Sequence, residues 1–170
     1  HGGEISKFLG DGFLAVFPVS EPDALACPAC AGALDAAREA LTRNAGLNAS
    51  RRRDGLPPLE ADMVLHYGRV VSGNVGTDRR LDFTVIGRAI NEASRIERLC
   101  DELGHPLLLS DAFARRCSTP LVAVGEFALR GVGRKQRIWG LSAEAAVPSE
   151  RTAGDGAPEP AQDAAREVSA

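Results

Sequence analysis

The sequence has no long apolar run, few aromatic residues and no strong excess of either charge. No stretch of its 170 residues approaches the roughly 20 apolar residues that a membrane-spanning helix needs, and no signal peptide is visible. Lysine and arginine total 20 against 23 acidic residues, and this near balance argues against nucleic acid as the main partner. With 44% hydrophobic residues, the composition excludes collagen-like and wholly disordered chains and favours one globular domain.

Cysteine is too scarce for a small disulfide-based scaffold. The four cysteines are Cys27, Cys30, Cys100 and Cys117, and only the first two form a C-x-x-C pair. A zinc site usually needs a second such pair or histidines at ligand spacing. We therefore predict reduced thiols that pack in helices as small hydrophobic residues, in keeping with a reducing cytosol.

The C-terminal residues 143–170 differ in composition from the rest of the chain. They hold six acidic residues, two arginines and three prolines, and no aromatic residue, leucine or isoleucine. Such a segment cannot bury enough apolar surface to offset its ordering entropy. We predict a disordered tail or linker after a domain at residues 1–142. Since the first residue is His1 rather than Met, we expect the chain to be part of a longer protein.

Apolar runs alternate with turn residues in a pattern typical of an α+β fold with a mostly antiparallel sheet. The expected elements are a hairpin of residues 5–9 and 13–17, a helix from Ser20–Asp23 to about Ala49, a loop containing 51–53, a strand at 63–71 broken by Gly68, a turn at 73–80, a strand at 81–86, a helix from Gly87 to about Leu103, a strand at 107–109, a short helix begun by Ser110 and running to about Arg116, and a hairpin of 121–129 and 136–141. Residues 13–17 are apolar on both faces, which predicts a buried strand.

The helix after Gly87 has two distinct faces, because residues three or four apart align on a helix. The face expected to pack on the sheet holds Ala89, Ala93, Ile96, Cys100 and Leu103, and the polar face holds Asn91, Arg95, Arg98 and Glu102. The guanidinium of Arg95 suits phosphate oxygens. Helical spacing alone leaves open whether this face binds a phosphorylated ligand or is simply solvated.

The first hairpin carries a second candidate group. Lys7 is followed four residues later by Asp11, which stands between two glycines at the predicted hairpin tip. A carboxylate there can approach a hard cation without crowding. Aspartate and glycine are also ordinary turn residues, so this motif alone does not distinguish a metal ligand from a turn.

Taken together, these segments resemble the class III nucleotidyl cyclases, the catalytic domains of adenylate and guanylate cyclases. The Lys-x-x-Gly-Asp hairpin of that family is similar to HGGEISKFLGDGFLAVFP. Its Gly-rich hairpin, Asp-[Phe/Tyr]-Thr-Val-Ile-Gly strand and Asn-x-x-x-Arg helix are similar to LHYGRVVSGNVGTDRRLDFTVIGRAINEASRIERL. The resemblance runs from His1 to about Leu141. It implies an α/β sandwich on a ferredoxin-like βαββαβ core, here lacking the first strand and helix, and a homodimer or pseudo-dimer with active sites shared between two chains.

The resemblance also implies a reaction, in which ATP or GTP is cyclised with release of pyrophosphate. Two Mg²⁺ or Mn²⁺ ions held by two aspartates assist the in-line attack of the ribose 3′-hydroxyl on the α-phosphorus. By position, Asp11 matches one metal ligand, and it would act with the other site residues of the partner chain. Lys7 and Thr84 match the purine contacts. Asn91 matches the residue that orients the ribose, and Arg95 the one that stabilises transition-state charge.

Lys7 and Thr84 favour ATP, because guanylate cyclases have Glu and a Cys or Ser at these positions. The predicted function is therefore an adenylate cyclase in cyclic-nucleotide signal transduction, with a guanylate cyclase or a catalytically silent, dimerising regulatory module as alternatives. No nucleic acid or membrane contact is expected of the domain. We expect it to face the cytosol, where ATP is, and leave open whether the longer protein is attached to a membrane.

Three departures from the family pattern affect these expectations. The family's other metal-binding aspartate lies upstream of His1, so the chain as given is expected to bind metal poorly and not to cyclise ATP, whatever the activity of the parent protein. Val132 stands where many members have a phosphate-binding lysine, which leaves two alternatives: Arg134 or Lys135 replaces the lysine, or the triphosphate is held less tightly. Arg88 stands where aspartate is frequent, and we expect it to be an exposed residue of the first helical turn.

Overall fold

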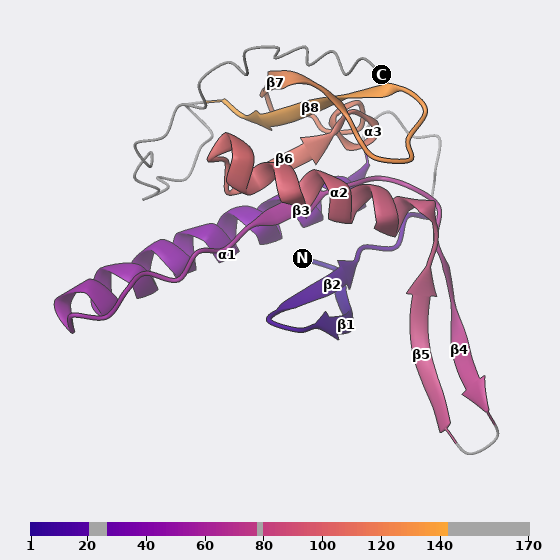
Figure 1. The fold of residues 1–170 in the computed structure, drawn as a ribbon, viewed down its shortest axis with the longest axis horizontal. Helices are drawn as coiled ribbons and strands as arrows, with labels where there is room; N and C mark the ends of the chain where they lie inside the picture. Colours follow the sequence, from indigo (N-terminus) through magenta and orange to yellow (C-terminus); the bar gives the residue numbers. More distant parts are fainter. Residues whose placement is uncertain (21–26, 78–79, 143–170) are drawn as a thin grey trace, which may run out of the picture.

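The computed structural model describes residues 1–20, 27–77 and 80–142, and a mixed four-stranded sheet lies at its centre (Figure 1). The strands follow the order β3, β6, β8 and β7 and span Met63–Leu65, Leu107–Ser110, Lys135–Leu141 and Leu121–Ala128. β3 runs parallel to β6, whereas β8 is antiparallel to both β6 and β7. The predicted C-terminal hairpin is confirmed.

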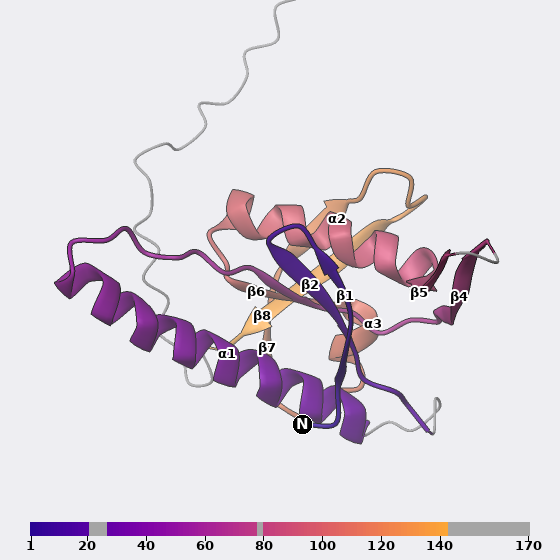
Figure 2. The same cartoon turned by 90° about the horizontal axis from the view of Figure 1, so that it is seen from below.

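Helices cover both faces of this sheet. α1 (Pro28–Arg53) packs in a cluster with Leu107 and Leu109, whereas α2 (Arg88–Leu103) packs in a cluster with Leu108. Successive side chains of a strand point to opposite faces. The three consecutive leucines of β6 therefore pack alternately against α1 and α2. Figure 2 shows α1 and α2 on opposite sides of β6 and β8. The predicted α+β class with mostly antiparallel pairing is confirmed.

α1 runs further than the sequence predicted. Cys27 is its N-cap residue, with Sγ accepting a backbone N–H of the first turn at 3.3 Å, and Pro28 takes the first helical position. The predicted start at Pro22 and Asp23 lies outside the described residues. The expected loop at 51–53 is wrong, since these three arginines form the last turn of α1. Positive charge there interacts favourably with the carboxyl end of the helix dipole.

β1 (Glu4–Leu9) and β2 (Gly12–Val16) form the predicted N-terminal hairpin. Gly10 at its tip has a φ of 67°, in the left-handed region that glycine enters without strain. The prediction that the second strand is buried is wrong, because Phe13 is 60% exposed. Within the part of the chain that the structure describes, this hairpin pairs with no third strand, and Ile5, Phe8 and Leu9 are exposed as well.

β4 (Val71–Thr77) and β5 (Arg80–Ile86) form a second hairpin, which projects away from the central sheet (Figure 1). The prediction of a turn beginning at Gly73 and Gly76 is wrong, since both glycines lie inside β4. Cross-strand pairing along the whole of β4 keeps them extended. The remainder of the predicted turn, at residues 78–79, lies outside the described residues.

The predicted strand at 63–71 is wrong in its middle, because β3 stops at Leu65 and residues 66–70 are irregular. The reason is close packing against α2. A Cβ atom placed on Gly68 would lie 2.6 Å from the Cβ of Ala89, closer than real side chains approach. This segment is therefore shaped by its contact with α2 rather than by strand pairing.

α2 has the predicted limits and the predicted amphipathic character. Gly104, with a φ of 65°, ends it after Leu103. Its buried residues are Ala89, Ile96, Leu99 and Cys100. Leu99 was not predicted on the packed face, and Ala93 is only half-buried. The other face is left for polar residues.

α3 (Asp111–Ala114) is shorter than predicted but begins where expected. The Oγ of Ser110 accepts the backbone N–H of Phe113 at 3.3 Å, which caps the first turn. Trp139, the only tryptophan of the chain, donates a hydrogen bond from Nε1 to Oδ1 of Asp111 at 3.2 Å. This bond ties α3 to β8.

The four cysteines are free thiols, as predicted, but only Cys30 and Cys100 lie within helices, since Cys27 caps α1 and Cys117 follows α3. Cys27, Cys30 and Cys100 are buried among apolar residues, and Cys117 is half-buried. The predicted tail at residues 143–170 lies outside the described residues, so the domain limits stay a prediction.

Candidate functional site

The polar face of α2 brings together two of the predicted site residues. Asn91 is exposed and Arg95 is half-buried, and one helical turn separates them. The guanidinium of Arg95 lies against Gly131 in the β7–β8 turn, since a Cβ atom on that glycine would be 3.4 Å from one guanidinium nitrogen. Gly131 has a φ of 72°, which adds a conformational reason for glycine at this turn. The turn thus restricts Arg95 while Asn91 faces solvent.

Val132, which stands where the family often has a phosphate-binding lysine, is part of the apolar packing beside Arg95. It is half-buried and packs against the cluster that contains Ile96 and Leu99, and its N–H donates to the carbonyl of Leu129 at 2.9 Å. Arg134 and Lys135, the predicted substitutes, are exposed two and three residues further along. Both line the cavity described below.

The predicted metal ligand Asp11 is exposed at the tip of the β1–β2 hairpin. Lys7 is exposed on β1, where it pairs with Leu14. A Mg²⁺ or Mn²⁺ ion needs several oxygen ligands. Within residues 1–20, 27–77 and 80–142, no three His, Cys, Asp or Glu side chains gather to hold a metal ion. Asp11 can therefore supply one ligand, but these residues do not form a metal site by themselves.

Thr84 is half-buried on β5 and pairs with Gly73 on the neighbouring strand. β5 contacts β1, the strand that carries Lys7. The structure thus places the five predicted residues on three elements: the β1–β2 hairpin, β5 and α2. None of the five lines the cavity of the single chain.

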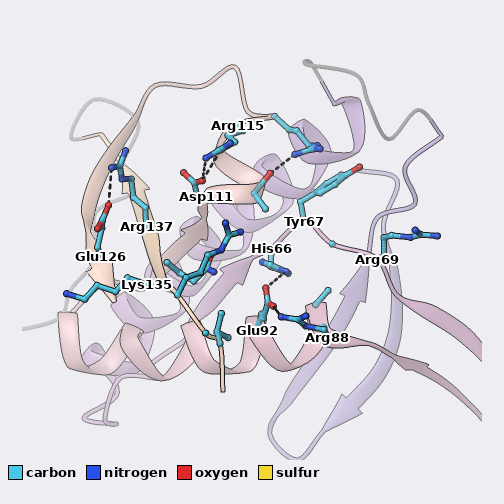
Figure 3. Close-up of a pocket in the computed structure, with 18 residues that line it drawn as sticks. His66, Tyr67, Arg69, Arg88, Glu92, Asp111, Arg115, Glu126, Lys135 and Arg137 are labelled. Carbon is cyan, nitrogen blue, oxygen red and sulfur yellow. Dashed lines mark hydrogen bonds and ion pairs between the residues drawn. The ribbon is translucent and has the colours of Figure 1, made fainter. Parts of the chain in front are cut away.

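A cavity of about 1070 Å³ opens between the segment after β3, the start of α2, α3 and the β7–β8 loop (Figure 3). Positively charged side chains dominate its lining. They are Arg69, Arg88, Arg115, Arg116, Arg134, Lys135 and Arg137. The acidic residues of the lining are Glu92, Asp111 and Glu126. Such a lining favours an anionic ligand.

Each acidic residue of the cavity forms an ion pair with an arginine. The distance from the guanidinium nitrogen to the carboxylate oxygen is 2.7 Å between Arg115 and Asp111, 3.0 Å between Arg137 and Glu126, and 3.5 Å between Arg88 and Glu92. Figure 3 shows these three pairs around the cavity. The other four cations of the lining, Arg69, Arg116, Arg134 and Lys135, form no ion pair with any other described residue. They carry the uncompensated positive charge.

Arg116 and His66 each have a buried side-chain nitrogen without a hydrogen-bond partner among the described residues. The guanidinium of Arg116 lies 3.9 Å from the ring centroid of Tyr67 and donates to the carbonyl of Ala112 at 3.0 Å. The side chain of His66 is 9% exposed, and its Nε2 lies 3.6 Å from Oε2 of Glu92. Burial lowers the pKa of His66 below its ordinary value of 6.5, and the carboxylate of Glu92 opposes this shift only in part.

The sequence analysis missed this cavity. Of its residues, Arg88 was predicted to be exposed in the first turn of α2, and its side chain is 85% exposed. The basic residues come from four separate stretches of the sequence, and no local motif connects them. Only the folded arrangement reveals the cluster.

No helix in the described part of the chain is long and apolar enough to cross a membrane.

Two of the known proteins that are similar in sequence to this chain are adenylate cyclases. No protein-family model matches the chain. An adenylate cyclase of Anabaena cylindrica is 34% identical over 140 residues, which are 82% of this chain and 26% of that protein. Adenylate cyclase 1 of Rhizobium meliloti (strain 1021) is 33% identical over 121 residues, or 69% of this chain and 17% of that protein. The chain thus spans about a quarter or less of these relatives.

Solved structures show the same fold. The guanylyl cyclase Cya2 aligns with a TM-score of 0.62 and 25% identity, covering 84% of this chain and 72% of that one. The adenylyl cyclase CyaB from P. aeruginosa aligns with a TM-score of 0.60 and 24% identity, covering 88% of this chain and 74% of that one.

Proposed function

Since the chain belongs to the class III nucleotidyl cyclases, we propose that it is part of an adenylate cyclase that converts ATP to 3′,5′-cyclic AMP and pyrophosphate. The observation that carries this proposal is the pairing of Asn91 and Arg95 on the polar face of α2. Asn91 is exposed, and the β7–β8 turn restricts the guanidinium of Arg95. One helical turn separates them, which supports a joint contact with one ligand.

Each of these side chains has a distinct task in the proposed reaction. The Asn91 amide donates and accepts hydrogen bonds, which orients the ribose. The Arg95 guanidinium stabilises the charge that develops on the phosphates, and its contact with Gly131 reduces the reorganisation needed in the transition state. Arg134 and Lys135 extend this positive surface towards the cavity, and they compensate for the apolar side chain of Val132.

Lys7 and Thr84 are the proposed adenine contacts. They lie on β1 and β5, and the contact between these strands supports a shared site. A lysine donates to ring nitrogen acceptors and a threonine hydroxyl adapts as donor or acceptor. Their identity favours ATP over GTP.

Divalent Mg²⁺ or Mn²⁺ is the proposed cofactor, and it would supply charge neutralisation at the phosphates. Asp11 is one ligand, and its exposed position on the hairpin tip leaves it open to a cation. The further ligands, including the second aspartate, come from outside the described residues. We also propose a homodimer in which Asp11 of one protomer serves the same site as Asn91 and Arg95 of its partner, with the domain facing the ATP-containing cytosol.

Two alternatives each have an observation in their favour. The apolar Val132 favours a silent regulatory module, because a phosphate-binding cation is missing at that position. The fold similarity to the guanylyl cyclase Cya2 favours GTP as the substrate. The combination of Lys7 and Thr84 is the argument against the second alternative.

The test is product formation by the longest natural protein that carries this sequence, with the 170-residue chain measured beside it. We expect cyclic AMP from Mn²⁺-ATP, much less cyclic GMP from Mn²⁺-GTP, and neither product from the 170-residue chain alone. A folded dimer that forms neither product would support the silent module. A preference for GTP would identify a guanylate cyclase.

A further inference from the structure

His66 occupies an unusual position directly after β3. Its side chain is 9% exposed, and its Nδ1 is buried without a hydrogen-bond partner among the described residues. A buried polar atom without a partner destabilises a fold, and native structures hold few of them. An apolar side chain would fill the same space without this cost, so the imidazole calls for a functional explanation.

The imidazole contacts the N-terminal half of α2. Its Nε2 lies 3.6 Å from Oε2 of Glu92, beyond a direct hydrogen bond but within the range of an ion pair. The other carboxylate oxygen of Glu92 lies 3.5 Å from the Arg88 guanidinium. Figure 3 shows Glu92 between His66 and Arg88. One carboxylate thus lies between a guanidinium and a ring nitrogen whose burial favours the neutral imidazole, so its contact with His66 is polar rather than a charged pair.

The backbone around His66 is packed tightly against the same part of α2. A Cβ atom on Gly68 would lie 2.6 Å from the Cβ of Ala89 and 3.0 Å from Nε2 of His66. A Cβ atom on Gly87, the residue before α2, would lie 3.0 Å from the carbonyl oxygen of Arg69. On the side that faces residues 66–70, α2 has no free space into which it could shift, so these residues help to fix the position of its first two turns.

These two turns carry the proposed catalytic pair. Glu92 follows Asn91 directly and precedes Arg95 by three residues, so any rotation of the helix that moves its carboxylate moves both side chains. A misplacement of about 1 Å can reduce turnover by about a hundredfold. The contact between His66 and Glu92 is therefore placed to control catalytic geometry without touching the substrate.

We propose that His66 is a positioning residue of the cyclase reaction, which acts through Glu92 to fix the first two turns of α2 and with them Asn91 and Arg95. This inference rests on the proposed function. It assigns no contact with nucleotide to His66, and its effect passes through one named carboxylate.

The test uses the longest natural protein that carries the sequence, with four variants. His66→Leu fills the core without a polar atom, whereas His66→Gln keeps an amide nitrogen near the position of Nε2. Glu92→Gln removes the charge that the imidazole contacts. His105→Gln is the matched control, because His105 is exposed beyond the other end of α2.

We expect His66→Leu and Glu92→Gln each to lower kcat by about tenfold to a hundredfold, with KM changed by less than about twofold. His66→Gln should retain most of the turnover, and His105→Gln all of it. The double variant His66→Leu with Glu92→Gln should be no slower than Glu92→Gln alone, because both changes break the same contact. Multiplied effects in the double variant would show that His66 does not act through Glu92 and would overturn the proposal.

Hydrogen exchange gives a readout that does not depend on activity. Amides in the first two turns of α2 should exchange faster in His66→Leu than in the wild type, with β7 and β8 unchanged. Uniformly faster exchange, with a parallel loss of turnover in His66→Gln, would mean a role in stability alone. If the wild type makes no cyclic nucleotide, the proposed function fails, and unchanged exchange in His66→Leu would separately overturn the positioning role.

Discussion

Individual side chains of α2 differ in how firmly the fold holds them. Arg95 is half-buried against Gly131, whereas Arg98 and Asn91 on the same polar face are exposed. Helical spacing placed all three on one face correctly, because 3.6-residue periodicity is a local property of the chain. The restriction of Arg95 by a turn 36 residues away was not predictable, since it depends on how β7 and β8 pack beside α2.

Replacing Asn91 or Arg95 by alanine tests their proposed roles. We expect turnover of the longest natural protein to fall by about a hundredfold or more, because each removes a contact made in the transition state. The free energy of unfolding should change by less than about 1 kcal/mol, since neither side chain is in the core. Kinetic assays and urea titration measure the two effects.

Arg98→Ala is the matched control, because Arg98 shares the polar face but has no proposed role. It should leave turnover unchanged. If Arg95→Ala lost stability and activity in the same proportion, or if Arg98→Ala were equally inactive, the assignment of Arg95 would be wrong.

The burial of Cys30 beside Cys27 leads to a prediction about thiol reactivity. Burial, aided by the neighbouring Cys27, raises the pKa of Cys30 to about 12. Only the thiolate is nucleophilic, so Cys30 should resist iodoacetamide at pH 8.5 while the half-buried Cys117 reacts. Mass spectrometry of the native and urea-unfolded chain measures this, and in urea all four cysteines should react. Modification of Cys30 in the folded chain at the rate of Cys117 would contradict its burial.

At the scale of elements, the conformation of residues 66–70 could not be predicted from the sequence pattern. The β1–β2 and β7–β8 hairpins and the two main helices follow from apolar periodicity and glycine turns. The strand predicted at 63–71 ends at Leu65 because the following residues pack under α2. Nothing in the local pattern reveals a helix that approaches from 20 residues further along the chain.

Gly68→Ala tests this packing. The added methyl group has no space beside Ala89, so we expect a loss of about 1–3 kcal/mol in the free energy of unfolding. The comparison is Gly46→Ala within α1, where a new Cβ meets no atom within 4 Å and should stabilise the chain by up to about 1 kcal/mol. Chemical denaturation of both variants measures the difference. Equal stability of the two would mean that residues 66–70 do not press against α2.

At the scale of the whole molecule, apolar side chains remain uncovered on both hairpins. Phe8 is 71% exposed and packs edge-to-face against Phe13, and Val71 and Ile86 on the β4–β5 hairpin are also exposed. Exposed apolar clusters on a folded chain mark interaction surfaces. The proposed second copy of this chain would cover them.

Phe8→Glu combined with Phe13→Glu should weaken this self-association by at least tenfold, because two charges would enter an apolar interface. Analytical ultracentrifugation measures the dissociation constant, and circular dichroism checks the fold. Leu47→Glu on α1 is the matched control at a similarly exposed leucine away from both hairpins. A double variant that dimerises as tightly as the wild type would exclude this surface.

The whole-molecule arrangement also explains which parts of the candidate site the sequence could reveal. Lys7, Asp11, Thr84, Asn91 and Arg95 stand in two continuous motifs, so the resemblance to a family identifies them. His66, Arg69 and Arg88 also lie within the second motif, but the sequence assigned them no role in the site, because they meet the other cavity cations only when the end of β3, α3 and the β7–β8 loop surround the start of α2. Their place in the candidate site therefore depends on tertiary packing.

The hydrogen bond between Trp139 and Asp111 has a practical consequence, because Asp111 also forms the ion pair with Arg115 at the cavity. An anion that draws the Arg115 guanidinium towards itself leaves the carboxylate more negative beside the indole. Indole emission shifts in wavelength with the local electric field. With a single tryptophan in the chain, intrinsic fluorescence becomes a label-free optical report of cavity occupancy.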